Sequence, residues 1–152
     1  MVTTVKTGSL ICENLARTED GELTFAGVRL SPLAQKYGTP LYLYDENRIR
    51  ERIKSYVDSA NRAFSGNAKV LYASKAASFK RIYEIASEEG IGIDVVSSGE
   101  IYTAKMAGFP LSQAYFHSNN KTDYDVEYAI SEGIGYFVVD NAEELYREIR
   151  NM

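Results

Sequence analysis

From residue 69 onwards the chain repeats one pattern: a short apolar run, a polar segment, and a stretch with apolar residues at helical spacing that ends at a glycine. The apolar runs begin near Val70, Ile91, Ala114 and Ile134. The separation of about 20 residues between successive runs is enough for a strand and a short crossover helix. A series of such units predicts right-handed crossovers and a parallel sheet, which is an α/β fold.

The predicted helices carry residues typical of helix ends. Ser78 is the predicted N-cap of a helix that ends at Gly90, because glycine adopts the left-handed backbone of a C-terminal cap at little cost. Two further helix starts have the spacing of a capping box, in which a polar residue is followed three positions later by an acidic one. These pairs are Thr122 with Asp125 and Asn141 with Glu144.

The pattern before residue 69 is different. Asp45 is predicted to open a longer amphipathic helix, with apolar residues at helical spacing from Ile49 to Phe64. We predict a strand at Pro40–Tyr44, directly before that helix. Further upstream, the segment Leu23–Val28 follows an Asp-Gly turn, which favours a short hairpin or arm. Residues 1–30 are therefore expected to belong with a part of the protein outside the βα core.

The predicted parallel sheet needs something beyond its own strands. Four parallel strands leave two unpaired edges unless the sheet closes on itself or a partner covers it. A barrel of eight βα units closes the sheet. We therefore expect residues 31–152 to form the N-terminal half of a (β/α)8 barrel of the TIM type.

The amino-acid composition limits the kinds of molecule that the protein is expected to bind. The chain has 17 Lys and Arg against 21 Asp and Glu, a net charge of −4, and no segment concentrates the basic residues, so a nucleic-acid partner is not expected. Cys12 is the single cysteine, which excludes an internal disulfide and favours a reducing compartment. No secretory leader and no apolar run of membrane-spanning length is recognised. We expect a cytoplasmic protein that acts on a small molecule, without a membrane partner.

Candidate functional residues lie where the predicted strands end, because the βα loops of a parallel sheet open on one face. These residues are Lys75, Asp94 with Ser97 and Ser98, His117 with Asn119 and Asn120, and Asp140. Strand ends are also where any chain becomes polar, and helix capping is the favoured interpretation for four residues at or beside these ends. The four are Ser97, Ser98, Asn119 and Asn141.

Lys75 follows an apolar strand in the segment YASKA, Tyr72 to Ala76. Burial there would disfavour the ammonium form and leave an amine that attacks a carbonyl. Taken alone, a strand-end lysine is more often solvated or paired with a carboxylate. Asp94 interrupts the apolar run Ile91–Val96, and a buried carboxylate needs a partner, which Lys75 on the neighbouring strand would supply.

The remaining polar and aromatic residues give weaker signals. His117 is the only histidine, and a lone histidine is more often a hydrogen-bonded structural residue than a ligand, so no metal site is expected. Lys105 and Lys121 are interpreted as solvated. Three tyrosines are interpreted as packing residues: Tyr102, Tyr128 and Tyr136. We find no phosphate-binding loop, dinucleotide fingerprint or glycine-flanked nucleophilic serine.

Four segments in order carry a family resemblance: YASKA, DVVSSGE (94–100), FHSNNKT (116–122) and VVDNAEEL (138–145). Together they resemble diaminopimelate decarboxylases, which are pyridoxal-phosphate enzymes built on an alanine-racemase-like barrel. The stretch GTPLYLYDE (38–46) is similar to that family's entry into the barrel. The resemblance covers nearly all of this chain but only the first part of the family's usual length.

The resemblance implies a cofactor and roles for three residues. Lys75 would bind the aldehyde of pyridoxal 5'-phosphate covalently and later carry a proton. Asp94 would lie close to Lys75 and the cofactor and tune their protonation, and His117 would lie on the cofactor side. Residues 1–30 would contribute to a separate β-domain.

The full-length protein would convert meso-2,6-diaminopimelate to L-lysine and carbon dioxide as a homodimer. This chain alone is expected to be inactive, because the resemblance implies that other parts of the site lie beyond it. Alternatives are another barrel-type pyridoxal-phosphate decarboxylase or racemase, a non-catalytic pyridoxal-phosphate carrier, and an α/β module without a site.

Overall fold

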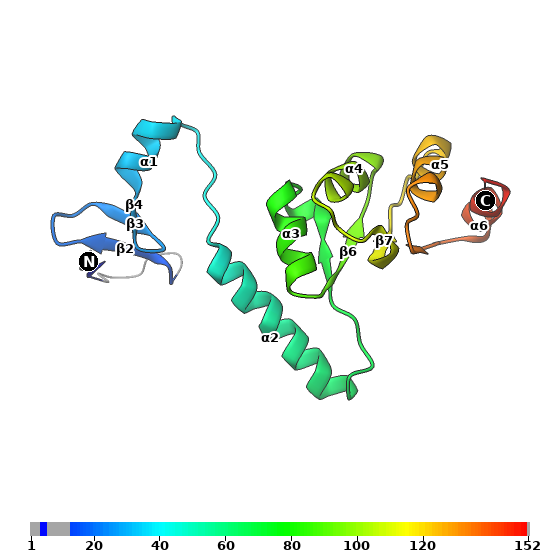
Figure 1. The fold of residues 1–152 in the computed structure, drawn as a ribbon, viewed down its shortest axis with the longest axis horizontal. Coiled ribbons are helices and arrows are strands. Elements are labelled where there is room, and N and C mark those ends of the chain that lie inside the picture. The colour runs from blue at the N-terminus through cyan, green and yellow to red at the C-terminus, as the bar shows by residue number, and fades with distance from the viewer. Residues whose placement is uncertain (1–3, 6–12, 152) are drawn as a thin grey trace. The chain divides into compact units, whose positions relative to one another are not determined.

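A computed structural model describes residues 4–5 and 13–151 (Figure 1). Cys12 lies outside the described residues, so the expectation about its redox state is not addressed. The chain separates into two compact units, Met1–Ile49 and Arg50–Met152. The expected division near residue 30 concerns the full-length protein and stays a prediction.

The first unit is built on a four-stranded antiparallel sheet with the order β1-β2-β3-β4. Its elements are β1 (Thr4–Val5), β2 (Leu15–Thr18), β3 (Leu23–Phe25), β4 (Val28–Arg29) and the helix α1 (Leu30–Tyr37). In the turn that joins β2 to β3, the Gly21 N–H donates to the Thr18 carbonyl at 3.0 Å, and Leu15 pairs with Phe25. The hairpin predicted after the Asp-Gly turn is confirmed.

The strand predicted at Pro40–Tyr44 is wrong for this structure. Neither sheet includes the segment, and the side chains of Leu41, Tyr42, Leu43 and Tyr44 are exposed. An extended segment becomes a strand only where a neighbouring strand exchanges backbone hydrogen bonds with it. Sequence alone reports the tendency to extend and not the presence of that neighbour.

The long helix predicted after Asp45 is confirmed as α2 (Glu46–Phe64). Asp45 accepts a hydrogen bond from the Arg48 backbone N–H at 3.2 Å, which satisfies one of the free donors of the first turn. Of the predicted apolar face, only Ile53 is fully buried.

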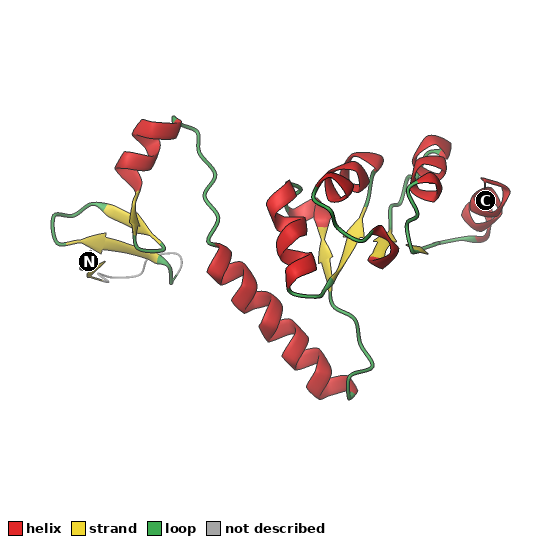
Figure 2. Ribbon diagram, in the orientation of Figure 1, coloured by secondary structure: helices red, strands yellow, loops and turns green. Residues whose placement is uncertain are grey.

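The second unit contains the predicted βα repeats, and its parallel sheet has the order β5-β6-β7-β8 (Figure 2). The strands are β5 (Leu71–Ala73), β6 (Gly92–Val95), β7 (Ala114–Phe116) and β8 (Tyr136–Phe137). The helices are α3 (Lys80–Glu88), α4 (Ser98–Met106), α5 (Asp123–Ser131) and α6 (Ala142–Asn151), with short 3-10 turns at Ser74–Ala76 and Leu111–Gln113. Strands that are consecutive in sequence are neighbours in space, as the predicted crossovers require.

The core lies between this sheet and its helices. Ile93 and Val95 on β6 and Phe116 on β7 are completely buried, and so are Tyr83 on α3 and Ile101 on α4. Side chains alternate along a strand, so Asp94 projects from the opposite face of β6 to Ile93 and Val95. The apolar pattern thus decides which face carries the polar residue.

Three of the predicted helix caps are confirmed. Ser97 caps α4 by accepting from the Glu100 N–H at 3.3 Å. Thr122 and Asp125 form a complete capping box at α5. Asn141 accepts from the N–H of Glu144 at 2.9 Å at the start of α6.

The other cap predictions are wrong. The residue before α3 is Phe79, and the Ser78 hydroxyl instead lies 2.8 Å from the hydroxyl of the buried Tyr83. Ser98 is the first residue of α4, and its N–H donates to Asp125 Oδ1 at 3.2 Å. Asn119 lies three residues before the true cap of α5, Thr122. A buried hydroxyl such as that of Tyr83 needs a partner, and that need competes with capping.

One prediction about the tyrosines is wrong: Tyr102 is 56% exposed and is not buried as a packing residue, whereas Tyr128 is half-buried. Tyr136 is 43% exposed, and its ring packs against that of Tyr115 with the ring centroids 4.2 Å apart. Lys105 is exposed as predicted and pairs with Glu132 at 2.7 Å.

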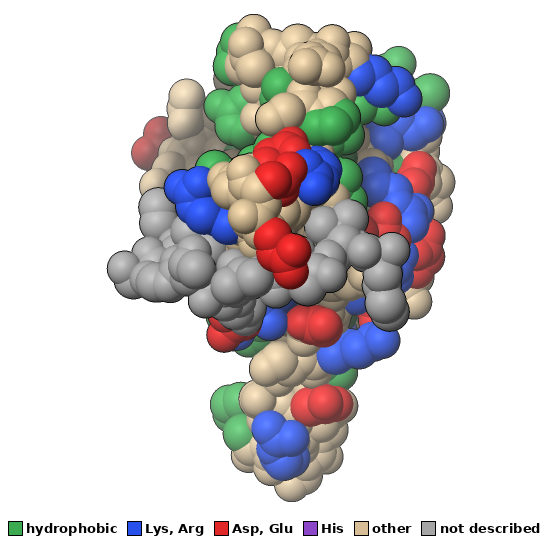
Figure 3. All heavy atoms as spheres, turned by 90° about the vertical axis from the view of Figure 1, so that its left-hand side faces the viewer, with side chains coloured by type: hydrophobic (Ala, Val, Ile, Leu, Met, Phe, Trp, Pro, Cys, Tyr) green, Lys and Arg blue, Asp and Glu red, His purple; other side chains and the backbone are tan. Residues whose placement is uncertain are grey.

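Acidic and basic side chains are interspersed on the face shown in Figure 3. Among the described helices, none combines the length and the apolar character that crossing a membrane requires.

Candidate functional site

The strand register brings the predicted site residues to one edge of the sheet. Asp94 on β6 pairs with Ala73 on β5 and with Tyr115 on β7. Lys75 and His117 each lie two residues beyond those partners along the chain. Three neighbouring strands therefore deliver Lys75, Asp94 and His117 to their carboxyl ends, where a parallel sheet places its functional loops.

Lys75 is exposed, which contradicts the expectation that its amine is removed from water. It lies in the 3-10 turn Ser74–Ala76, and the three residues of β5 before it are only half-buried. β5 is an edge strand of its sheet, so it lacks a neighbour on one side. The preceding Ser74 is fully buried, and its hydroxyl oxygen has no hydrogen-bond partner in the described part of the chain.

Asp94 faces His117 rather than Lys75. Asp94 Oδ2 lies 3.8 Å from His117 Nδ1, a distance at which a protonated imidazole forms an ion pair. The other carboxylate oxygen, Oδ1, is buried and accepts no hydrogen bond from the described residues. The predicted ion pair between Asp94 and Lys75 is not formed. Because a buried polar atom is costly without a partner, Asp94 Oδ1 marks a position suited to a ligand donor.

Glu100 belongs to this site and escaped the sequence analysis. Its carboxylate accepts a hydrogen bond from the Val96 N–H at 2.8 Å. Burial raises the pKa of Glu100, and the nearby Asp94 charge raises it further, whereas the Val96 hydrogen bond and the Lys75 ammonium act in the opposite direction. The signal was present, because Ser97 and Glu100 have capping-box spacing.

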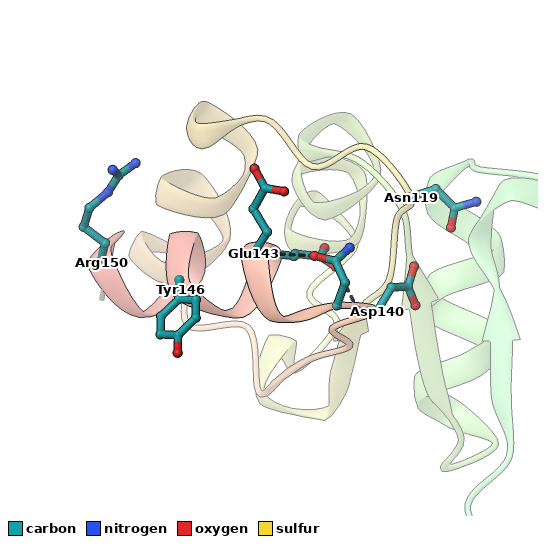
Figure 4. Close-up of a pocket in the computed structure, with 7 residues that line it drawn as sticks. Asn119, Asp140, Glu143, Tyr146 and Arg150 are labelled. Atoms are coloured by element: carbon teal, nitrogen blue, oxygen red, sulfur yellow. Dashed lines mark hydrogen bonds between the residues drawn. The ribbon is translucent and has the colours of Figure 1, made fainter.

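A pocket of about 590 Å³ lies where β7 and β8 end (Figure 4). Asn119 and Asp140 contribute to it from the loops after these strands, and Glu143, Tyr146 and Arg150 contribute from α6. The Asp140 N–H donates to Glu144 at 2.9 Å, which holds this loop against the helix. The predicted strand-end residues therefore divide into a group around Asp94 and a group around α6.

Lys121 is fully buried, so its interpretation as a solvated residue is wrong. Its ammonium donates to the Val138 carbonyl at 2.7 Å, pairs with Glu144, and lies 3.0 Å from Glu148 Oε1. Burial of a lysine requires such partners. One of them, Glu148, lies 27 positions further along the chain and gives no local signal.

The arrangement can hold a ligand that bears a carbonyl group. The Lys75 amine is accessible to an electrophilic carbon, and Asp94 Oδ1 is available to a ligand donor. No group of three or more His, Cys, Asp or Glu side chains suited to a metal ion occurs within residues 4–5 and 13–151.

Solved structures with a similar fold include a diaminopimelate decarboxylase from M. jannaschii, with a TM-score of 0.80 and 31% identity, covering 91% of this chain and 32% of that one. A lysine/ornithine decarboxylase from Vibrio vulnificus, complexed with putrescine, has a TM-score of 0.67 and 26% identity, covering 78% of this chain and 31% of that one.

Sequence comparison identifies relatives of the same kind as the structural comparison. The chain is 44% identical to the diaminopimelate decarboxylase of Staphylococcus aureus over 84% of its length, and 48% identical to that of Bacillus methanolicus, also over 84%. It spans 30% and 29% of the length of these relatives. Residues 47–151 match the family model described as pyridoxal-dependent decarboxylase, pyridoxal binding domain. The chain therefore belongs to the family of pyridoxal-dependent decarboxylases.

Proposed function

We propose that the full-length protein, of which this chain forms the N-terminal part, decarboxylates meso-2,6-diaminopimelate to L-lysine and carbon dioxide. The observation that carries the proposal is the identity of 44% to 48% with curated diaminopimelate decarboxylases over 84% of the chain. A further M. jannaschii structure is a diaminopimelate decarboxylase in co-complex with L-lysine, the product of this reaction, and matches with a TM-score of 0.79.

The cofactor that family membership implies is pyridoxal 5'-phosphate, and the described residues fit it. Its aldehyde needs an accessible amine, which Lys75 provides, and a donor on the bound cofactor would satisfy Asp94 Oδ1. When bound, pyridoxal 5'-phosphate supplies an electron sink for the bond that loses carbon dioxide.

The side chains around the cofactor position have separate tasks in this proposal. Lys75 Nζ would hold the cofactor at its aldehyde carbon, and the same amine, when free, would hold the proton destined for the substrate Cα. Asp94 orients the bound group through Oδ1 and holds His117 through Oδ2, at 3.8 Å from Nδ1. Glu100, whose pKa burial raises, holds a proton beside Asp94 more readily than an exposed glutamate does.

The assay for this proposal is carbon dioxide release by the purified full-length protein with added pyridoxal 5'-phosphate. We expect release from meso-2,6-diaminopimelate with stoichiometric L-lysine, and slower release from L-ornithine, L-lysine and L-arginine at equal concentration. Faster release from ornithine or lysine would assign the protein to the reaction of the Vibrio vulnificus relative instead. Release from none of the four would overturn the proposal.

We further propose a cytoplasmic homodimer in which the antiparallel sheet β1–β4 forms part of a separate β-domain. Support comes from the family resemblance and from the separation of Met1–Ile49 as a compact unit. Light scattering of the eluted full-length protein should give twice the mass of one chain. A monomeric mass with full activity would contradict the dimer.

A further inference from the structure

Lys121 carries a buried charge that the proposed reaction does not use. The Lys121 side chain is 0% exposed. The side chains of Glu144 and Glu148 are 9% and 2% exposed. A lysine ammonium has three N–H donors, and three acceptors surround this one: the Val138 carbonyl, Glu144 and Glu148. Lys121 donates hydrogen bonds to Val138 and Glu144, and its contact with Glu148 Oε1 at 3.0 Å is an ion pair without a hydrogen bond among the described residues. We call Lys121, Glu144 and Glu148 the Lys121 cluster.

The cluster sets the orientation of α6. Glu144 and Glu148 are one helical turn apart and face inwards, whereas the apolar Leu145 and Ile149 of the same helix are 44% and 57% exposed. Burial of apolar area alone would favour the opposite rotation of this helix in the described chain. The pairing with Lys121 accounts for the acidic face lying inwards.

The same contacts reach the strand ends of the candidate site. Lys121 bonds the carbonyl of Val138, whose N–H donates to the Phe116 carbonyl at 3.0 Å. The next residue, His117, donates its own N–H to the Val95 carbonyl at 2.9 Å. The ends of β6, β7 and β8 are thus joined in one chain of hydrogen bonds, and Lys121 closes the loop that follows His117.

We propose that Lys121 is a positioning residue: its buried ion pairs with Glu144 and Glu148 fix the loop 117–121 and so hold the His117 ring at Asp94. The kinetic consequence rests on the decarboxylase activity proposed above. The structural consequence, a fixed environment of His117, does not depend on it.

The test compares variants of the full-length protein. Lys121→Met leaves two buried carboxylates without their cation and is expected to fold poorly. The triple variant Lys121→Met, Glu144→Gln, Glu148→Leu removes the uncompensated charge, and folds because apolar replacement of a buried ion cluster is often tolerated. The matched control is Lys105→Met, which removes an exposed lysine that pairs with a glutamate.

Two readouts separate positioning from a purely structural role. In the triple variant we expect kcat for diaminopimelate to fall about 100-fold, because misplaced site residues cost about that much. We also expect the imidazole NMR signals of His117, assigned with His117→Gln, to shift from their wild-type positions. Lys105→Met should leave both unchanged.

A folded triple variant with wild-type kcat and unshifted His117 signals would overturn the proposal. If no variant, including the wild type, releases carbon dioxide, the function proposed above fails, and the His117 signals still decide whether Lys121 positions this residue. If the triple variant does not fold, the Glu148→Gln variant, which retains Lys121 and Glu144, takes its place. In this variant we expect the imidazole NMR signals of His117 to shift from their wild-type positions by a smaller amount. Unshifted His117 signals in Glu148→Gln would then count against the proposal.

Discussion

Lys75 and Lys121 both lie in loops that follow strands of the parallel sheet, and their surroundings are opposite. Lys121 is buried and holds Val138, Glu144 and Glu148 as partners. Lys75 is exposed and makes no ion pair among the described residues. A buried lysine held by hydrogen bonds and ion pairs inside the chain contributes to structure, whereas an accessible amine remains available for a covalent bond.

Two carboxylates, Glu144 and Asp94, differ in the same way as the two lysines: one has its partners within the chain and the other does not. Glu144 accepts from Lys121 and from the Asp140 N–H. Asp94 has one oxygen buried without a partner and the other 3.8 Å from His117. Natural proteins accept such incompletely satisfied groups mainly at functional sites. This difference supports our proposals that the site lies at the ends of β5, β6 and β7 and that the Lys121 cluster holds its surroundings in place.

The largest effect is expected from the exposed lysine. Lys75→Ala in the full-length protein should lower kcat/KM for diaminopimelate by more than about 1000-fold, because it removes the amine that we propose binds the cofactor. The control is Lys80→Ala, at an exposed lysine on α3. Both variants should keep wild-type stability, since both side chains are exposed. Substantial activity in Lys75→Ala would assign the covalent role to another residue.

The buried lysine should show the reverse: a large effect on stability. Lys121→Met is expected to lower the free energy of unfolding by about 3–5 kcal/mol, because two carboxylates lose their buried partner. Lys105→Met removes an exposed ion pair and should cost at most about 1 kcal/mol. Urea denaturation of the full-length variants measures both. Equal losses in the two variants would remove the distinction between the buried and the exposed pair.

Asp94 tests the contrast between carboxylates. Asp94→Asn keeps the shape of the side chain and removes its charge, so the affinity for pyridoxal 5'-phosphate should fall about tenfold, as expected for one charge-assisted hydrogen bond. Stability should change by less than about 0.5 kcal/mol, because no partner in the chain loses a strong ion pair. Cofactor titration followed by absorbance gives the affinity. Unchanged affinity together with a marked loss of stability would place Asp94 among the structural carboxylates.

The smallest effect concerns Glu100. Its pKa in the folded chain is raised above the ordinary value of 4.5, mainly by burial. Folding therefore favours the protonated form, and this contribution to stability is present below pH 4.5 and is lost as the pH rises through the raised value. Relative to Glu100→Gln, the wild type should become less stable over this rise. A constant difference across the range would contradict the raised pKa.

The sequence predicted the regular part of the fold well. Strands, helices and their order in the second unit follow from apolar spacing and from caps such as Thr122 and Asn141, which act within one helical turn. The segment 41–44 shows the limit, because its apolar residues favour extension but no neighbouring strand includes it in a sheet.

The polar residues were harder to assign, because burial depends on partners distant in sequence. Lys121 was predicted to be solvated and is buried, since Glu144 and Glu148 arrive from α6. Lys75 was predicted to be buried and is exposed, since β5 is an edge strand. Strand periodicity placed Asp94 and His117 at one edge, but their mutual orientation depends on the register of three strands.

We propose that Lys75, and not Lys121, is the lysine that pyridoxal 5'-phosphate modifies. Borohydride reduction of the full-length protein with bound cofactor, followed by mass mapping of its peptides, tests this directly. We expect one reduced pyridoxyl adduct within these 152 residues, on Lys75. An adduct on Lys121 or another lysine, or no adduct in a protein that binds the cofactor, would contradict it.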